Sequence, residues 1–258
     1  MKSLEEIIDL DYESFVKELK TLAKEPKIQA ILNAGREDGK PNDEKIKFSK
    51  GNVIASSLKP TQKQLIFEKS VKWTLIAKDV KTTADIIGGG PVNLDNKPIV
   101  TLNNEYIIDG HHRWIEAYLF NPACKVVVYN MTTDEDPIDV LKIVQMAIAA
   151  IEHDLPFSNR KGTDMYKVSD DKFRELVDES VDKKILTLMA MDPGELGDFL
   201  LDNLHNLKKP AKGSPNREYM PQPGKAKNWD KKLQKGEINF KPPFLKEHAS
   251  FKDFNSKS

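Results

Sequence analysis

The sequence is poor in cysteine and contains no long apolar run. Its single cysteine, Cys124, excludes an internal disulfide and any cysteine-based metal cluster. No apolar stretch approaches the roughly 20 residues that a membrane span needs. The acidic residues Glu5 and Glu6 lie where a secretory signal would be apolar. Together these absences predict a cytosolic protein.

The sequence also lacks net charge, although its charges are unevenly distributed. Residues 205–258 carry 13 basic and 5 acidic side chains, and the rest of the chain has the matching negative surplus because 40 basic residues balance 40 acidic ones overall. This basic tail is either solvated or docks on its own acidic body, on nucleic acid or on an acidic protein partner. Aromatic residues, which suggest anchors that dock into grooves, are spaced along it: Trp229, Phe240, Phe244, Phe251 and Phe254.

A Walker-type phosphate loop is missing as well, because the G-x-x-x-x-G-K-[ST] pattern does not occur. The three consecutive glycines at 88–90 are therefore either a different phosphate-contacting loop or a flexible hinge. The mean hydropathy of −0.54 indicates that part of the chain stays solvated. A length of 258 residues suits one large domain, or one domain with appendages.

The order of apolar patterns predicts an α+β protein in four segments. We expect an N-terminal helical extension over 1–45, a compact mixed-sheet domain over 46–155, a helical region over 156–207 and an extended basic tail over 208–258. The extensions would be the surfaces for protein assembly partners. Helices are expected at 3–24, 62–71, 82–87, 112–120, 136–152, 170–177, 182–189 and 193–207. Strands are expected at 46–49, 52–57, 98–102, 105–108 and 124–129.

Titratable residues are crowded at one strand–turn–helix junction. The apolar run 106–108 reads as a buried strand, Gly110 permits a sharp turn, and an apolar helix face follows. Backbone N–H groups at a helix start are unpaired and attract anions. A packed core does not need the polar side chains that surround this point, so we expect function here. They are Asp109, His111, His112 and Arg113.

Each of these side chains has a chemical role that it can play beside a phosphate. Arg113 offers a permanently charged, forked donor, and His111 and His112 donate hydrogen bonds or add charge when protonated. Asp109 would hold Mg²⁺ through one carboxylate, orient a histidine ring or act as a general base. The alternatives are structural: a turn-capping Asp109 and two structural histidines. A transition-metal site is disfavoured because no third ligand stands out.

The chain resembles the ParB/sulfiredoxin fold over residues 52–131, about a third of its length. The resemblance rests on the Asp-Gly-His-His-Arg run and on the order of the pieces around it. Those pieces are Leu58-Lys59-Pro60-Thr61-Gln62, a helix, the segments 98–102 and 105–108, the 109–113 run, a second helix and the strand 124–129. It implies nucleotide binding at Gly110–Arg113, with Thr61 and Gln62 facing the nucleotide from the opposite side. The alternatives are that Thr61 is a plain helix N-cap and that Lys59 is a surface lysine instead of a phosphate contact.

The motif differs from two branches of that fold and matches a third. Sulfiredoxins have Gly-Cys-His-Arg, so His111 replaces their catalytic cysteine and argues against sulfinic-acid reduction. Partition-type ParB proteins have Gly-Glu-Arg-Arg, so His111 and His112 replace their acidic residue and first arginine. No helix-turn-helix is recognisable after residue 137. Free-serine kinases have Asp-Gly-His-x-Arg, which this chain matches at Asp109, Gly110, His111 and Arg113.

Three functional hypotheses follow. The first is a nucleotide-binding enzyme, a Mg²⁺-dependent phosphotransferase or nucleotide hydrolase that uses ATP, ADP or CTP, with Asp109 and His111 as catalytic residues. The second is a non-catalytic assembly module, because the chain is similar to phage-encoded ParB-like proteins, some of them in virions; its location would then be the host cytoplasm or the virion. The third is non-specific DNA binding or nuclease action through the basic tail.

Overall fold

The computed structural model describes residues 47–138, 140–141, 162–215 and 217, together with the isolated residues 17 and 21. The chain divides into two compact units, and residues 49–130 and 160–217 form the one that contains the candidate site. The predicted helix at 3–24, most of the predicted helix at 136–152 and the tail beyond 217 lie outside the described residues. No helix in the described ranges has the length and apolar character to cross a membrane.

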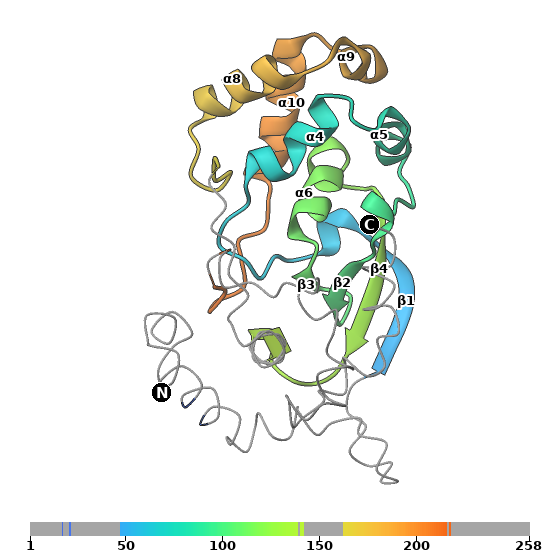
Figure 1. The fold of residues 1–258 in the computed structure, drawn as a ribbon, viewed down its shortest axis with the longest axis vertical. Coiled ribbons are helices and arrows are strands. Elements are labelled where there is room, and N and C mark those ends of the chain that lie inside the picture. Colours follow the sequence, from blue (N-terminus) through green and yellow to red (C-terminus); the bar gives the residue numbers. More distant parts are fainter. Residues whose placement is uncertain are drawn as a thin grey trace. The chain divides into compact units, whose positions relative to one another are not determined.

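Four strands form one sheet in the order β1-β4-β2-β3 (Figure 1). They are β1 (Lys47–Ile54), β2 (Ile99–Leu102), β3 (Tyr106–Asp109) and β4 (Lys125–Thr132). With the helices described below, they confirm the expected α+β class. The prediction of two extended pieces before residue 58 is wrong, because β1 is continuous across Gly51 and a 3₁₀ turn (Ala55–Ser57) follows it. Gly51 lies inside this strand and so does not mark a turn. An added Cβ there would meet nothing within 4 Å, so packing does not require a glycine at this position.

The hairpin of β2 and β3 delivers the chain to the candidate site. The two strands are antiparallel, with Leu102 opposite Tyr106, and they lie where strands were expected at 98–102 and 105–108. Asn103 and Asn104 both take left-handed backbone angles, which asparagine tolerates better than most residues. The Asn130 side chain accepts a hydrogen bond from the Asn104 amide at 2.6 Å, and this contact fixes the turn against β4.

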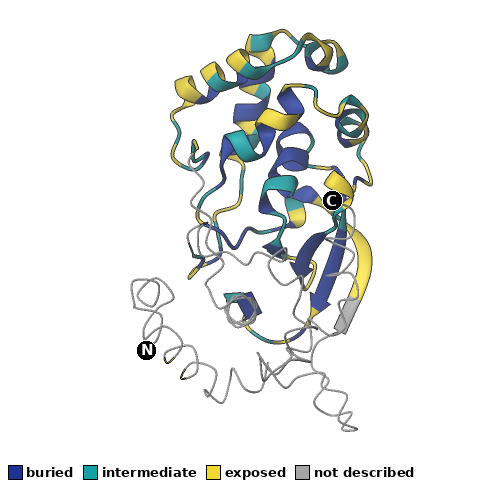
Figure 2. Cartoon of the chain, viewed as in Figure 1, coloured by how far each residue is buried: buried dark blue, intermediate teal, exposed yellow. Residues whose placement is uncertain are grey.

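Helix α6 (His111–Phe120) follows β3 and forms the centre of this unit's core. Trp114, Ile115 and Leu119 are completely buried, and the burial colouring in Figure 2 shows much of this helix as buried. The Trp114 indole donates a hydrogen bond of 2.8 Å to the Ala55 carbonyl. The helix ends before Asn121-Pro122, as proline requires. The predicted helix at 112–120 is therefore confirmed.

The predicted helix at 62–71 is wrong over most of its length. The chain is non-helical from 61 to 66, and only a 3₁₀ turn (Phe67–Lys69) and the short helices α4 (Val71–Leu75) and α5 (Val80–Ile87) follow. Ile66 pairs instead with Asp164, and the Met165 amide donates to the Leu65 carbonyl at 2.8 Å. Tertiary pairing with a segment about a hundred residues away thus overrides the local helical pattern.

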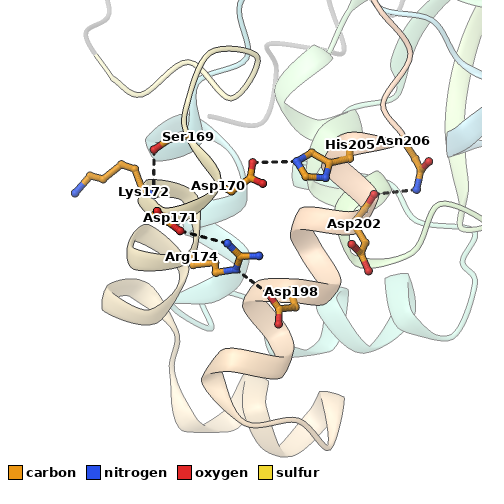
Figure 3. A network of polar contacts seen from close by, with 9 residues as sticks. All are labelled: Ser169, Asp170, Asp171, Lys172, Arg174, Asp198, Asp202, His205 and Asn206. Carbon is orange, nitrogen blue, oxygen red and sulfur yellow. Dashed lines mark hydrogen bonds and ion pairs between the residues drawn. The ribbon is translucent and has the colours of Figure 1, made fainter.

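The three helices expected after residue 170 are present as α8 (Asp170–Ser180), α9 (Lys183–Met189) and α10 (Pro193–His205). Apolar side chains of these helices join the same core cluster as α6, so they belong to the same compact unit. Exposed polar contacts also link α8 to α10 (Figure 3): Arg174 pairs with Asp198 at 2.7 Å and His205 with Asp170 at 3.0 Å.

Cys124 lies immediately before β4 and is completely buried. Burial raises the pKa of its thiol to about 11, so the group stays protonated near neutral pH. Cys124 is therefore a small residue of the core.

Candidate anion-binding site

The turn between β3 and α6 depends on Gly110. This residue is left-handed (φ 98°, ψ 19°), and an added Cβ would lie 2.9 Å from Arg113 Nη2 and 3.3 Å from Ile99 Cγ1. No other residue type would fit without displacing the Arg113 guanidinium. A glycine therefore lets Arg113 fold back against the turn that precedes its own helix.

The start of α6 differs from that of the other long helices. A Ser or Asp side chain at the N-cap accepts a hydrogen bond from the first turn of α5, α8, α9 and α10, whereas the N-cap of α6 is Gly110, which has no side chain, and the first turn of α6 contains no acidic residue. The amide dipoles at this end carry partial positive charge. A helix start of this kind attracts anions.

Arg113 lies beside this helix start and is held by two acceptors. Its Nη2 donates to Asp109 Oδ2 at 3.1 Å and to the Pro98 carbonyl at 3.3 Å. The Arg113 and Asp109 side chains are 17% and 26% exposed, so both are partly shielded from water. Arg113 Nε is buried and has no hydrogen-bond partner within the part of the chain that the structure describes. The guanidinium is thus oriented, while one of its donors is left for another acceptor.

His111 is buried and acts as a hydrogen-bond acceptor. Its Nε2 accepts a bond of 3.0 Å from the Thr61 amide, and this places the ring proton of the neutral form on Nδ1. Burial, with the nearby charges of Arg217 and Arg113, lowers the pKa of His111 to about 3. The ring is therefore neutral at physiological pH, and the positive charge of the site comes from its arginines.

His112 links the helix start to two distant segments. Its Nε2 lies 3.1 Å from the Ile66 amide and 3.3 Å from Arg217 Nε, both of which donate to it. Arg217 is 9% exposed and is far from α6 in sequence. The pattern of residues around the turn could not reveal it. The one available signal is that Arg217 is the only arginine among the 13 basic residues of 205–258.

Of the two polar residues expected to face the nucleotide, Thr61 is brought to the turn. Besides its amide bond to His111, its hydroxyl donates to the Ile107 carbonyl on β3. No helix begins at Thr61, so the N-cap alternative is wrong. Gln62 is also buried, but its side-chain amide donates to the Gln64 carbonyl in its own loop. Lys59 lies over the Tyr106 ring, with Nζ 5.6 Å from the ring centroid.

The glycine run at 88–90 packs against the start of β4. The Lys125 amide donates to the Gly89 carbonyl at 2.9 Å, and an added Cβ at Gly90 would clash with the Lys125 carbonyl. Close approach of two backbone segments therefore explains why Gly90 has no side chain.

No protein-family model matches this chain, and neither a curated protein nor a solved structure matches it. The resemblance to the ParB/sulfiredoxin fold stays a prediction from the sequence.

In the described ranges, no three His, Cys, Asp or Glu side chains come together as a metal-binding group. Asp109 alone would offer one carboxylate to a Mg²⁺ that phosphate oxygens also hold, which is a usual coordination for this ion. Glu116, which the sequence analysis did not single out, is 9% exposed, and burial with the nearby charge of Asp95 raises its pKa to about 8.

Proposed function

We propose that this protein binds the phosphates of a nucleotide or another polyphosphate at the start of α6. The observation that carries the proposal is the packing of Arg113 against the left-handed Gly110, which is also the N-cap of α6 and has no side chain to cap it. Forked guanidinium donors and helix-start amides are both groups that proteins commonly direct at phosphate. Here both lie within one turn of the chain.

The surroundings support binding of an anion more than binding of a cation. The guanidiniums of Arg113 and Arg217 flank two histidine rings, of which His111 is buried and neutral. Asp109 is the carboxylate paired with Arg113, and its charge keeps that guanidinium aligned. The attraction of a phosphate dianion to the two arginines would exceed its repulsion from this single carboxylate.

The sequence resemblance favours ATP, ADP or CTP with Mg²⁺ as the ligand. Asp109 would hold the metal together with phosphate oxygens, and the ion would neutralise charge on the phosphates. In the catalytic form of the proposal, Asp109 also accepts the proton of the attacking hydroxyl or water. The reaction class would then be phosphotransfer or nucleotide hydrolysis.

Titration calorimetry with ATP, ADP, CTP and inorganic pyrophosphate, each with and without Mg²⁺, tests the binding proposal. We expect Arg113→Ala to lower the affinity about tenfold or more, since it removes a charge-assisted donor pair. Arg174→Ala is the matched control, because Arg174 is also an arginine paired with aspartate but lies on α8. An absence of heat with all four ligands would refute the proposal.

Catalysis is tested separately with Asp109→Asn. Asparagine retains an oxygen acceptor for Arg113 but loses the negative charge. We expect binding to persist while phosphate release or transfer disappears. Binding by the unaltered protein without any turnover would instead favour the non-catalytic assembly module.

A further inference from the structure

Residues 208–215 and 217, here called the strap, follow α10 and run beside the loop at 57–64 (Figure 1). The Ala211 amide donates to the Pro60 carbonyl at 2.9 Å, and the Lys63 amide donates to the Pro215 carbonyl at 3.0 Å. The Lys208 ammonium adds a bond of 2.7 Å to the Ser57 carbonyl. Backbone contacts in both directions therefore hold the strap along the whole loop.

The strap ends at the candidate site. The Arg217 amide donates to the Gln64 side chain at 3.2 Å, and Arg217 Nε donates to His112 Nε2 at 3.3 Å. The loop that the strap follows also carries Thr61, whose amide binds His111. Loop and strap are thus each tied to one of the first two residues of α6.

A buried arginine at this place has an electrostatic consequence. Arg217 is 9% exposed and approaches a helix start that already carries Arg113 and partial positive charge from its amides. Like charges in a shielded region repel one another more strongly than at the surface. Both guanidiniums act electrostatically on His111, so an anion at the turn would be attracted by both.

We propose that Arg217 is a second phosphate-binding residue of the α6 turn and that the strap carries it there. This inference rests on the proposed function and adds to it a binding residue and the segment that positions it. Since coupling between two binding events is reciprocal, a ligand that contacts Arg217 also stabilises the seating of the strap on the loop. Bound phosphate then strengthens the contact between the strap and the loop.

The first test compares substitutions at Arg217 with inorganic pyrophosphate as the probe. Arg217→Gln keeps an N–H donor for His112 but removes the charge, and we expect it to weaken binding about tenfold. Arg217→Lys keeps the charge without the fork and should lie between the two. Lys212→Ala, an exposed basic residue of the same strap, is the control and should bind as the unaltered protein does. Unaltered affinity in Arg217→Gln would show that Arg217 only positions His112 and would overturn the inference.

The second test measures hydrogen exchange at the Ala211 and Lys63 amides, which bridge the strap and the loop. We expect saturating pyrophosphate to slow both amides severalfold in the unaltered protein but not in Arg217→Gln. If pyrophosphate binds and neither amide responds, the inference fails while the proposed function stands. If the unaltered protein does not bind pyrophosphate or a nucleotide, both fail together.

Discussion

Gly110 is the residue on which the shape of the candidate site depends. Its backbone is left-handed, and Arg113 occupies the space that a side chain would fill. The sequence predicted this turn because glycine lies between an apolar strand and an apolar helix face. The same local reading placed Asp109 and Arg113 beside this turn, on its strand side and its helix side.

Gly110→Ala should therefore weaken phosphate binding and destabilise the protein. A left-handed alanine costs about 1–2 kcal/mol, and its Cβ would push the guanidinium away from the turn. We expect at least a tenfold loss of pyrophosphate affinity by calorimetry. Gly89→Ala is a matched control, because Gly89 is also left-handed (φ 94°) but has nothing within 4 Å of an added Cβ. Equal losses of affinity in the two variants would contradict the role assigned to Gly110.

Glu116 makes stability depend on pH. Its pKa of about 8 in the folded protein lies above the ordinary value of 4.5, because burial and Asp95 disfavour the charged form while Lys78 and Arg113 favour it. Between these two pH values the folded state keeps a proton that the unfolded state releases. The stabilisation is therefore complete below about pH 4.5 and is lost as the pH rises toward about 8.

Glu116→Gln should remove this contribution to the pH dependence. We expect the variant to exceed the unaltered protein in unfolding free energy at pH 8 by about 1–3 kcal/mol, with little difference near pH 4.5. Urea unfolding at a series of pH values measures it, with the exposed Glu105→Gln as control. Parallel stability curves for Glu116→Gln and the unaltered protein would contradict the assignment.

At the scale of elements, patterns that are local in sequence were predicted well. The β2–β3 hairpin, α6, α8, α9 and α10 lie where the apolar pattern predicted them. The failure at 62–66 has the opposite cause, because this segment is held by distant parts of the chain. Residues 65–67 pair with residues 163–165 and Lys63 pairs with Pro215, and a pattern within one window contains no information about these partners. Arg217 and Glu116 were missed for the same reason.

Apolar packing, and not surface ion pairs, should hold α8 in place. Phe173 is completely buried, and its ring meets Phe67 edge to face, with centroids 6.0 Å apart. We expect Phe173→Ala to lower the unfolding free energy by about 3–5 kcal/mol. The neighbouring Arg174→Ala removes an exposed ion pair with Asp198 and should leave the urea midpoint nearly unchanged. A larger effect from Arg174→Ala than from Phe173→Ala would contradict this view.

At the scale of the whole molecule, the strap ties the C-terminal helices to the candidate site. Composition alone placed a linker-like basic segment from residue 208 onward, because lysine, proline and glycine dominate there. The compact unit nevertheless continues to Arg217, held by backbone hydrogen bonds that composition does not reveal. The basic charge in this part of the chain therefore has two meanings. Up to Arg217 it belongs to the folded unit, and beyond Arg217 it belongs to the segment for which we expect contacts with an assembly partner or nucleic acid.

Two truncations separate these meanings. Deleting residues 218–258 leaves the strap and Arg217 in place, so we expect pyrophosphate affinity to stay within about threefold of that of the full chain. Deleting residues 208–258 also removes Arg217 and uncovers the loop at 57–64, and we expect the affinity to fall at least tenfold, as in Arg217→Gln. Calorimetry gives the affinities, and light scattering gives the assembly state of each form. Because both forms lack 218–258, a loss of affinity in both would place the phosphate contact beyond Arg217. A change of oligomeric state in both would assign assembly to that same segment, as the non-catalytic alternative requires.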